Sequence, residues 1–139
     1  MELITSLTNA KVKMALSLQQ KKYRDKYQLF ILEGIRNAEM VIAKNISVQM
    51  CFFTQKAFTN ERGKSILEQL NCPCFEIPEH IYQKISDTQS PQGLMLILPI
   101  QNHNLDDLAT INKSGLYLIL DRLQDPGNIG TIIRTADAM

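Results

Sequence analysis

The last part of the chain, residues 116–139, constrains its fold more than any other stretch. An apolar run, 116–120, is followed by a turn, 121–127, and then by a segment with helical spacing that opens at Asn128. The side-chain oxygen of Asn128 can accept from the first free N–H groups of that helix. The pattern predicts a strand, a tight loop and a helix start, which together direct backbone N–H groups and a positive helix dipole at an anion.

Arg134 lies one to two turns into this predicted helix. Its planar guanidinium can therefore contact a phosphate near the loop through two parallel hydrogen bonds. These features alone are also compatible with an ordinary strand-to-helix connection in an α/β protein. Spacing therefore predicts an anion site without specifying its ligand.

The residue string from Leu120 to Ala138 resembles the first signature motif of the SpoU (TrmH-type) RNA ribose 2′-O-methyltransferases. The matching positions are Asp121, Asp125, Pro126, Asn128, Gly130, Arg134, Thr135 and Ala136. Thr131 departs from the small residue that is usual at its position. The resemblance implies transfer of a methyl group from S-adenosylmethionine to a ribose 2′-oxygen of ribosomal or transfer RNA.

The resemblance also implies the catalytic residues, Arg134 and Asn128. Arg134 would stabilise the alkoxide that develops on the ribose, together with a neighbouring RNA phosphate. An arginine whose pKa lies above about 12 is a poor general base, so we expect electrostatic stabilisation and positioning. Asn128 would hold the loop and the ribose-phosphate. A surface arginine and a pure helix cap remain the alternatives for these two residues.

Residues 4–99 alternate between helical and strand-like patterns, which predicts an α/β layered domain with helices covering a largely buried sheet. The predicted helices are about Ala10–Lys22, Ile35–Asn45, Glu61–Leu70 and Glu79–Ser86. The predicted strands are Leu29–Glu33, Val48–Phe53, Cys74–Ile77 and Leu94–Leu98. We expect the Leu29–Glu33 strand to be buried, because its apolar residues are continuous.

A cluster of cations lies near the N-terminus, although the formal net charge of the chain is only +1. Its members are Lys11, Lys13, Lys21, Lys22, Arg24 and Lys26, against the single acid Asp25. Two tyrosines, Tyr23 and Tyr27, lie among these cations, and aromatic rings can stack on unpaired bases. The cluster predicts an RNA-binding face, and a solvated surface of helix Ala10–Lys22 is the alternative.

The segment 4–99 also resembles the substrate-binding domain that precedes the catalytic domain in many SpoU enzymes. The matching residues are Lys21–Arg24, Phe30–Gly34, Arg36, Thr88 and Ser90–Gly93. In that family the domain looks like ribosomal proteins that bind RNA kinks. The implied RNA-binding residues are Lys21, Lys22, Arg24, Arg36 and Gln92, although structural roles remain open for Arg36 and Gln92. Glu33 and Gly34 fit a strand end and a turn.

We expect three regions: an RNA-binding domain over 1–100, a linker over 101–115 and the start of a SpoU methyltransferase domain over 116–139. The linker is polar, with a solvated His103 and at most one helical turn around 105–109. The last helix shows no stop signal, so we expect the chain to break off inside the catalytic domain. In the family that domain is knotted, binds S-adenosylmethionine and pairs as a homodimer. We expect no cofactor-binding residues and no activity in these 139 residues alone.

Other classes of protein fit the sequence less well. The spacing Cys72-Pro-Cys74 does not match a zinc pair, so Cys51, Cys72 and Cys74 are expected to be reduced thiols without a metal. The turn after Gly127 lacks the lysine of a phosphate-binding loop. The sequence shows neither a membrane-spanning run nor a signal peptide, which predicts a cytoplasmic protein. A non-catalytic RNA-binding module remains the alternative to the methyltransferase.

Overall fold

The computed structural model of the chain describes residues 1–102 and 117–139. The chain divides into two compact units, Met1–Gln101 and Asn102–Met139. The expected helical turn around 105–109, the solvated His103 and most of the expected linker lie outside the described residues. Within the described ranges, no helix combines the length and apolar character needed to cross a membrane.

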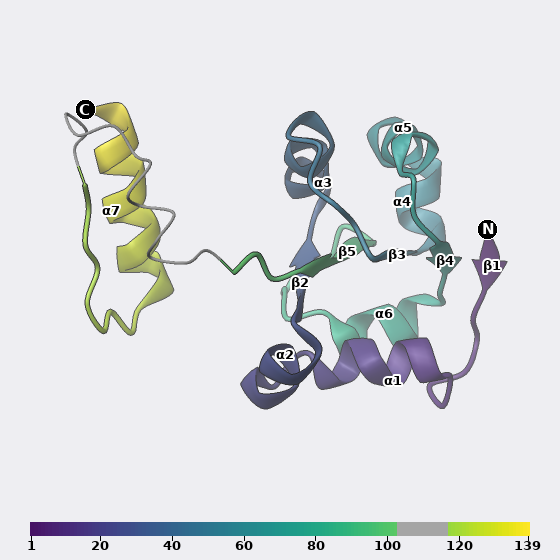
Figure 1. The fold of residues 1–139 in the computed structure, drawn as a ribbon. Helices are drawn as coiled ribbons and strands as arrows, with labels where there is room; N and C mark the ends of the chain where they lie inside the picture. Colours follow the sequence, from purple (N-terminus) through teal and green to yellow (C-terminus); the bar gives the residue numbers. More distant parts are fainter. Residues whose placement is uncertain (103–116) are drawn as a thin grey trace. The chain divides into compact units, whose positions relative to one another are not determined.

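The first unit is built on a five-stranded mixed sheet with the order β1-β4-β3-β5-β2 (Figure 1). Its strands are β1 (Glu2–Leu3), β2 (Leu29–Glu33), β3 (Met50–Phe53), β4 (Cys74–Glu76) and β5 (Leu94–Pro99). Strands β1, β4 and β3 run parallel, whereas β5 is antiparallel to both β3 and β2. This order leaves β1 and β2 as the two edges of the sheet.

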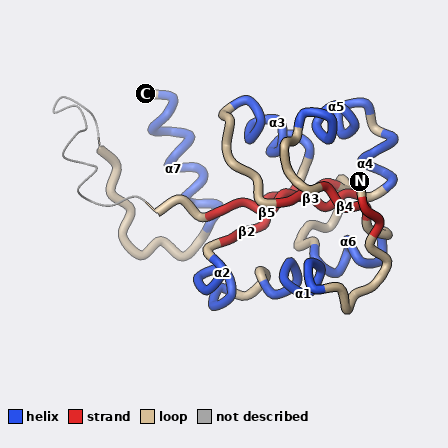
Figure 2. Tube along the Cα trace, turned by 45° about the vertical axis from the view of Figure 1, so that its right-hand side comes forward, coloured by secondary structure: helices blue, strands red, loops and turns tan. Residues whose placement is uncertain are grey.

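Helices cover both faces of this sheet, which confirms a layered α/β architecture (Figure 2). One face carries α1 (Ala10–Ser17), α2 (Lys21–Tyr27) and α6 (Glu79–Ile85). The opposite face carries α3 (Ile35–Ala43), α4 (Gln55–Thr59) and α5 (Glu61–Gln69). The second unit contains one described helix, α7 (Pro126–Ala138).

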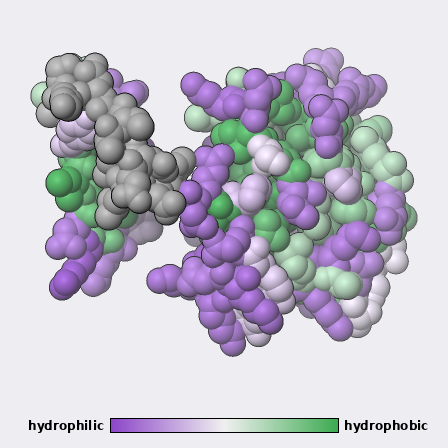
Figure 3. Space-filling view, viewed as in Figure 1, coloured by the Kyte–Doolittle hydropathy of each residue, from purple (hydrophilic) through white to green (hydrophobic). Residues whose placement is uncertain are grey.

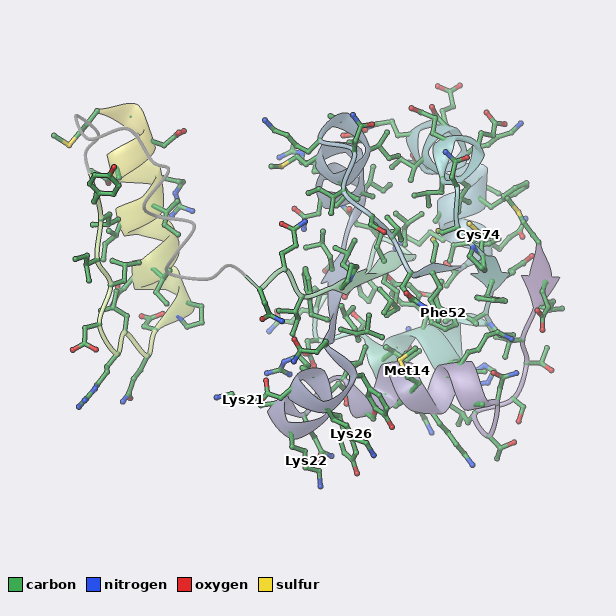
Figure 4. All side chains as sticks on the ribbon, in the orientation of Figure 1. Met14, Lys21, Lys22, Lys26, Phe52 and Cys74 are labelled. Carbon is green, nitrogen blue, oxygen red and sulfur yellow. The ribbon has the colours of Figure 1, made fainter. Side chains whose placement is uncertain are left out.

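Two hydrophobic clusters hold the layers together, because alternate residues of a strand point to opposite faces. In β3, Phe52 (Figure 4) belongs to the cluster beneath α1 and α6. The centroid of its ring lies 5.8 Å from that of Phe75. Its neighbours Cys51 and Phe53 belong to the cluster beneath α3 and α5. The side chain of Phe52 is fully buried, so it belongs to the core on this face of the sheet.

The structure corrects the predicted helix Ala10–Lys22, which is two helices with a break between them. Helix α1 ends at Ser17, and Gln20 adopts an extended conformation before α2 begins at Lys21. Leu18 in the break is 1% exposed, so its burial in the core favours the bend over a continued helix. The stretch 23–27, expected to follow the helix, is therefore itself helical.

The prediction that Leu29–Glu33 is buried is also wrong, since β2 is an edge strand whose residues are only half-buried. Continuous apolar residues do not distinguish an edge strand from a central one. Two elements were not predicted, β1 and α4, which have only 2 and 5 residues. Elements this short show too little periodicity to be recognised in a sequence.

The structure does not show the strand expected at the start of the second unit. Residues 117–120 have no strand assignment and are exposed, and Leu116 lies outside the described residues. An isolated strand leaves its backbone N–H and C=O groups without partners, so a strand forms only beside another. Among residues 117–139 no second strand is present to supply those partners.

Candidate functional site

A polar pocket of about 280 Å³ lies where β2 ends and α3 begins. Its lining residues are Glu33, Gly34, Arg36, Asn37, Thr88, Ser90 and Gln92. The loop between α6 and β5 supplies the last three, so the pocket joins two segments that lie far apart in the sequence. It brings together Arg36 and Gln92, two of the residues expected to bind RNA.

The carboxylate of Glu33 fixes one wall of this pocket. It accepts hydrogen bonds from the hydroxyls of Tyr82 at 3.1 Å, Ser86 at 2.9 and 2.8 Å, and Thr88 at 2.9 Å. Burial raises the pKa of Tyr82, and the Glu33 carboxylate raises it further, so this phenol stays protonated and remains a donor. Sequence reasoning missed Tyr82 and Ser86, because nothing in their spacing points to Glu33.

The first turn of α3 forms the opposite wall. Gln92 Oε1 accepts from the backbone N–H of Ile35 at 2.8 Å and so satisfies one of the free donors at the helix start. Gly34 has a φ of +106°, and a Cβ at this position would lie 3.3 Å from Gln92 Oε1. The backbone conformation therefore favours a glycine here, and a Cβ would also press on the end of the Gln92 side chain.

Arg36 is exposed at the second residue of α3, beside this turn. A helix start already favours negative charge, and an arginine adds a bidentate donor. Three hydroxyls donate to the Glu33 oxygens and stabilise its carboxylate, whose negative charge stays in the pocket and opposes part of this effect. The pocket can therefore receive a phosphate or another anionic oxygen through Arg36.

A second basic surface is formed by α2. Lys21, Lys22 and Lys26 are exposed and extend away from the helix (Figure 4). In the space-filling view hydrophilic residues gather over this helix (Figure 3). The α2 surface carries these three lysines against Asp25, which suits a negatively charged polymer.

Arg24 belongs to α2 but points inward. Its Nη1 donates to the backbone carbonyls of Leu18 at 2.9 Å and Gln19 at 2.8 Å. These bonds satisfy acceptors at the end of α1 and hold α2 against the break. The structure therefore gives Arg24 a structural role, and contact with RNA remains a prediction for the rest of its guanidinium.

Lys11 of α1 does not form one face with the lysines of α2. Lys11 Nζ lies 3.9 Å from Glu2 Oε2 and 4.7 Å from the centroid of the Phe75 ring. Both contacts are on β1 and β4, at the side of the sheet away from β2 and α2. The basic surface is thus narrower than the sequence indicated.

In the second unit, the turn that precedes α7 differs from the prediction in its cap. Asp125, not Asn128, caps the helix, because its Oδ1 accepts from the N–H of Gly127 at 2.7 Å. Pro126 occupies the first helical position, where its fixed φ suits a helix start and its missing N–H has no cost. Asn128 therefore lies inside the first turn with an exposed side chain.

Arg134 is exposed on α7, two turns after the cap. Its Nη2 donates to Thr131 Oγ1 at 3.2 Å, and Thr131 Oγ1 in turn donates to the Gly127 carbonyl at 2.9 Å. A Cβ at Gly130 would lie 3.4 Å from Arg134 Nη1. The Arg134 guanidinium therefore lies beside Gly130 and Thr131, back toward the N-terminal end of α7.

The three cysteines, at positions 51, 72 and 74, are free thiols. Cys51 and Cys74 face each other in the register of β3 and β4, and Cys74 Sγ donates to the Cys72 carbonyl at 3.4 Å. Within residues 1–102 and 117–139, no group of three potential ligands could hold a metal ion. These thiols contribute to packing beneath α3 and α5.

Comparison with known proteins gives the relatives of this chain. Residues 9–96 match the family of the MRM3-like substrate binding domain. The chain is 33% identical over 138 residues to the 23S rRNA (guanosine(2553)-2′-O)-methyltransferase RlmP of Bacillus subtilis, covering 99% of this chain and 51% of that protein. The chain thus spans about half the length of this relative.

Solved structures show the same relationship. The crystal structure of an rRNA methyltransferase from Sinorhizobium meliloti superposes with a TM-score of 0.80 at 30% identity, covering 99% of this chain and 51% of that one. A second structure of an rRNA methyltransferase from that organism, with AdoMet bound, has a TM-score of 0.78 at 31% identity and covers the same shares. Both similarities extend over the two units.

Proposed function

Because this chain belongs to the SpoU (TrmH-type) family of RNA ribose 2′-O-methyltransferases, we propose that the whole protein transfers a methyl group from S-adenosylmethionine to a ribose 2′-hydroxyl of ribosomal or transfer RNA. The observation that supports this most is the match to a 23S rRNA 2′-O-methyltransferase across 99% of the chain, which includes the turn and helix of residues 121–138. S-adenosylmethionine would supply an electrophilic methyl group. We assign no residue of 1–102 or 117–139 to holding it.

Arg134 is the proposed catalytic residue. A ribose hydroxyl is a weak nucleophile at neutral pH, so the transition state needs positive charge beside the oxygen that loses its proton. Arg134 is exposed, and among residues 1–102 and 117–139 its guanidinium donates one hydrogen bond, to Thr131, which leaves further donors for a phosphate and a ribose oxygen. This arrangement favours electrostatic stabilisation and positioning over general base catalysis.

Asn128 is the second proposed catalytic residue, with a changed role. Since Asp125 already caps α7, the Asn128 side chain does not serve as the cap and is exposed. Its amide can both donate and accept, which suits the ribose-phosphate backbone. We propose that Asn128 positions the nucleotide and that Arg134 carries the charge.

The first unit is proposed to select the RNA. Two surfaces support this: the pocket with Arg36 and Gln92, and α2 with Lys21, Lys22 and Lys26. They lie at opposite ends of β2, an edge strand of five residues that spans roughly 13 Å at 3.3 Å per residue. We propose that RNA follows this edge, and that this unit binds RNA in the way that the resemblance to kink-binding ribosomal proteins implies.

A non-catalytic RNA-binding module is the second candidate, because the matched family is described as a substrate binding domain. Methyl mapping separates the two. RNA from cells that lack the intact gene should lose one 2′-O-methyl group, and the gene should restore it. If ribosomal and transfer RNA keep every methyl group, the enzymatic proposal fails and the binding module stands.

The resemblance also supports a cytoplasmic homodimer. The relative from Bacillus subtilis acts on 23S rRNA, which in that bacterium lies in the cytoplasm, and pairing of two catalytic domains is usual in the family. Light scattering on the whole protein should give twice the mass of one chain. A mass of one chain would remove the homodimer from the proposal.

A further inference from the structure

Helix α2 carries two tyrosines one turn apart whose rings are stacked. The centroids of Tyr23 and Tyr27 lie 6.1 Å apart, and the ring planes differ by 13°. Tyr23 is half-buried, whereas Tyr27 is 42% exposed. The pair therefore forms a small aromatic surface whose outer member is open to solvent.

A lysine lies over each ring. Lys22 Nζ is 4.7 Å from the centroid of Tyr23, and Lys26 Nζ is 5.4 Å from the centroid of Tyr27. Residue types thus alternate so that each ring has a cation beside it. Along a nucleic acid strand, each base is likewise accompanied by a phosphate. Surfaces that bind single strands combine cations for the phosphates with aromatic rings on which the bases stack.

We propose that the Tyr23–Tyr27 pair is a stacking platform for one unpaired RNA base, with Lys22 and Lys26 binding the phosphates on either side. The inference rests on the proposed function and narrows its substrate to RNA with an unpaired nucleotide at α2. A base inside a duplex has both faces covered by its neighbours, so only an unpaired base can offer a face to Tyr27.

The helix is held in place before RNA arrives. None of its residues is buried, yet Arg24 ties it to the carbonyls of Leu18 and Gln19. At its other end, Gln28 Nε2 donates to the Asp25 carbonyl at 2.7 Å, and the chain turns directly into β2. A platform fixed at both ends loses little conformational freedom on binding, which favours affinity.

The lysines do not block the platform. A cation–π contact at an exposed site is weaker than the stacking of a base on an aromatic ring. When RNA binds, each ammonium can move from a ring face to a phosphate, where a full negative charge replaces the quadrupole of the ring. In the complex, a base therefore replaces the ammonium on the tyrosine ring, and a phosphate replaces the ring as the partner of the ammonium.

Tryptophan fluorescence tests the proposal directly, because the chain contains no tryptophan. In the variant Tyr27→Trp of the 139-residue chain, the indole should report on stacking. An unstructured oligoribonucleotide should quench its emission. The same strand annealed to its complement, and an abasic strand of equal length, should not. Quenching by the abasic strand to the same extent, or binding without any quenching, would overturn the platform.

Affinity measured by fluorescence anisotropy gives a second test. Tyr27→Ala should weaken binding of the single-stranded probe about tenfold, whereas Tyr27→Phe, which keeps the ring, should stay within about twofold. Met40→Ala is the control, since Met40 is a 63% exposed apolar residue of α3 on the other face of the sheet. If Tyr27→Ala binds like Met40→Ala while the whole protein still methylates RNA, the platform is wrong and the proposed function stands.

Discussion

The hydroxyl of Tyr82 donates to Glu33 Oε1 over 3.1 Å, and this bond joins helix α6 to the end of strand β2. Tyr82 is fully buried in the same core cluster as Phe52, whereas Glu33 lines the pocket that contains Arg36. The shape of the pocket is thus fixed from inside the protein. Ser86 and Thr88 extend the same network into the loop that carries Gln92.

The first prediction concerns alkaline stability. The pKa of Tyr82 is raised in the folded protein by burial and by Glu33, relative to about 10 in an unfolded chain. The stability that depends on its proton is therefore complete below about pH 10 and falls by about 1.4 kcal/mol per pH unit above it. Denaturant unfolding at several pH values should show this extra loss in the wild type and not in Tyr82→Phe.

At neutral pH the same variant should be less stable than the wild type by about 1–2 kcal/mol, because one hydrogen bond to a carboxylate is lost. Ser86 and Thr88 still serve the carboxylate, which limits the cost. The two stability curves should therefore converge as the pH rises. If the two curves of unfolding free energy stay parallel from pH 7 to pH 11, loss of the Tyr82 proton is not coupled to unfolding, and the prediction is wrong.

The second prediction concerns Gln92, whose Oε1 caps the N–H of Ile35. Gln92→Ala should cost about 1 kcal/mol of folding free energy and should weaken RNA binding, because the first turn of α3 loses its partner. Gln69→Ala is a matched control, since the hydrogen bonds that the Gln69 amide makes with Ser65 stay within its own helix α5. A loss of RNA affinity that is equal in both variants would show that the cap does not shape the RNA site.

The third prediction concerns salt. Lys21 and Lys22 are exposed cations of α2, and each phosphate contact adds about 0.7 to the slope of log affinity against log salt for a single strand. Replacing both by alanine should lower the slope by up to about 1.4. Replacing Lys44 and Lys64, exposed on the opposite side of the sheet, should leave it unchanged. An equal drop of the slope in both double variants would show that the net charge of the protein, and not the α2 surface, sets the salt dependence.

The fourth prediction separates stability from binding within α2. Arg24→Ala removes two hydrogen bonds to the carbonyls of Leu18 and Gln19 and should cost about 2 kcal/mol of folding free energy. Lys21→Ala, one turn away, should stay within about 0.5 kcal/mol of the wild type, because Lys21 is exposed. Thermal unfolding measures both. If Arg24→Ala is as stable as the wild type, the two hydrogen bonds do not stabilise the fold, and RNA binding becomes the main role proposed for Arg24.

The sequence predicted most of the α/β order, because the helices α3, α5 and α6 and the strands β3, β4 and β5 have clear apolar periods. It did not predict the break at Leu18, since a buried leucine fits a continuous helix as well as a bend. It also did not show that β2 is an edge strand. Strand order is set by pairing between distant segments, and no local pattern contains it.

The candidate site was predictable in part. Arg36 and Gln92 were named from a family resemblance, and they line one pocket. The network of Glu33 with Tyr82 was not predictable, because 49 residues separate the two in the chain. Asp125 was predicted to lie in the turn, and the structure shows that it is the helix cap. The preference of proline for the first helical position would have placed the cap at the residue before Pro126 from the sequence alone.

The last prediction concerns Arg134 in the whole protein. If its guanidinium stabilises a developing alkoxide, Arg134→Ala should lose about a hundredfold or more of the rate of methyl transfer, as removal of one preorganised donor does in other enzymes. RNA affinity should change only a few-fold, because the first unit is proposed to supply most of the contacts with RNA. Arg122→Ala is the control: Arg122 lies in the same segment, its side chain is 92% exposed, and it lies 3.7 Å from Asp121. Transfer of a radiolabelled methyl group at saturating RNA measures both variants, and equal rates would exclude Arg134 from the chemical step.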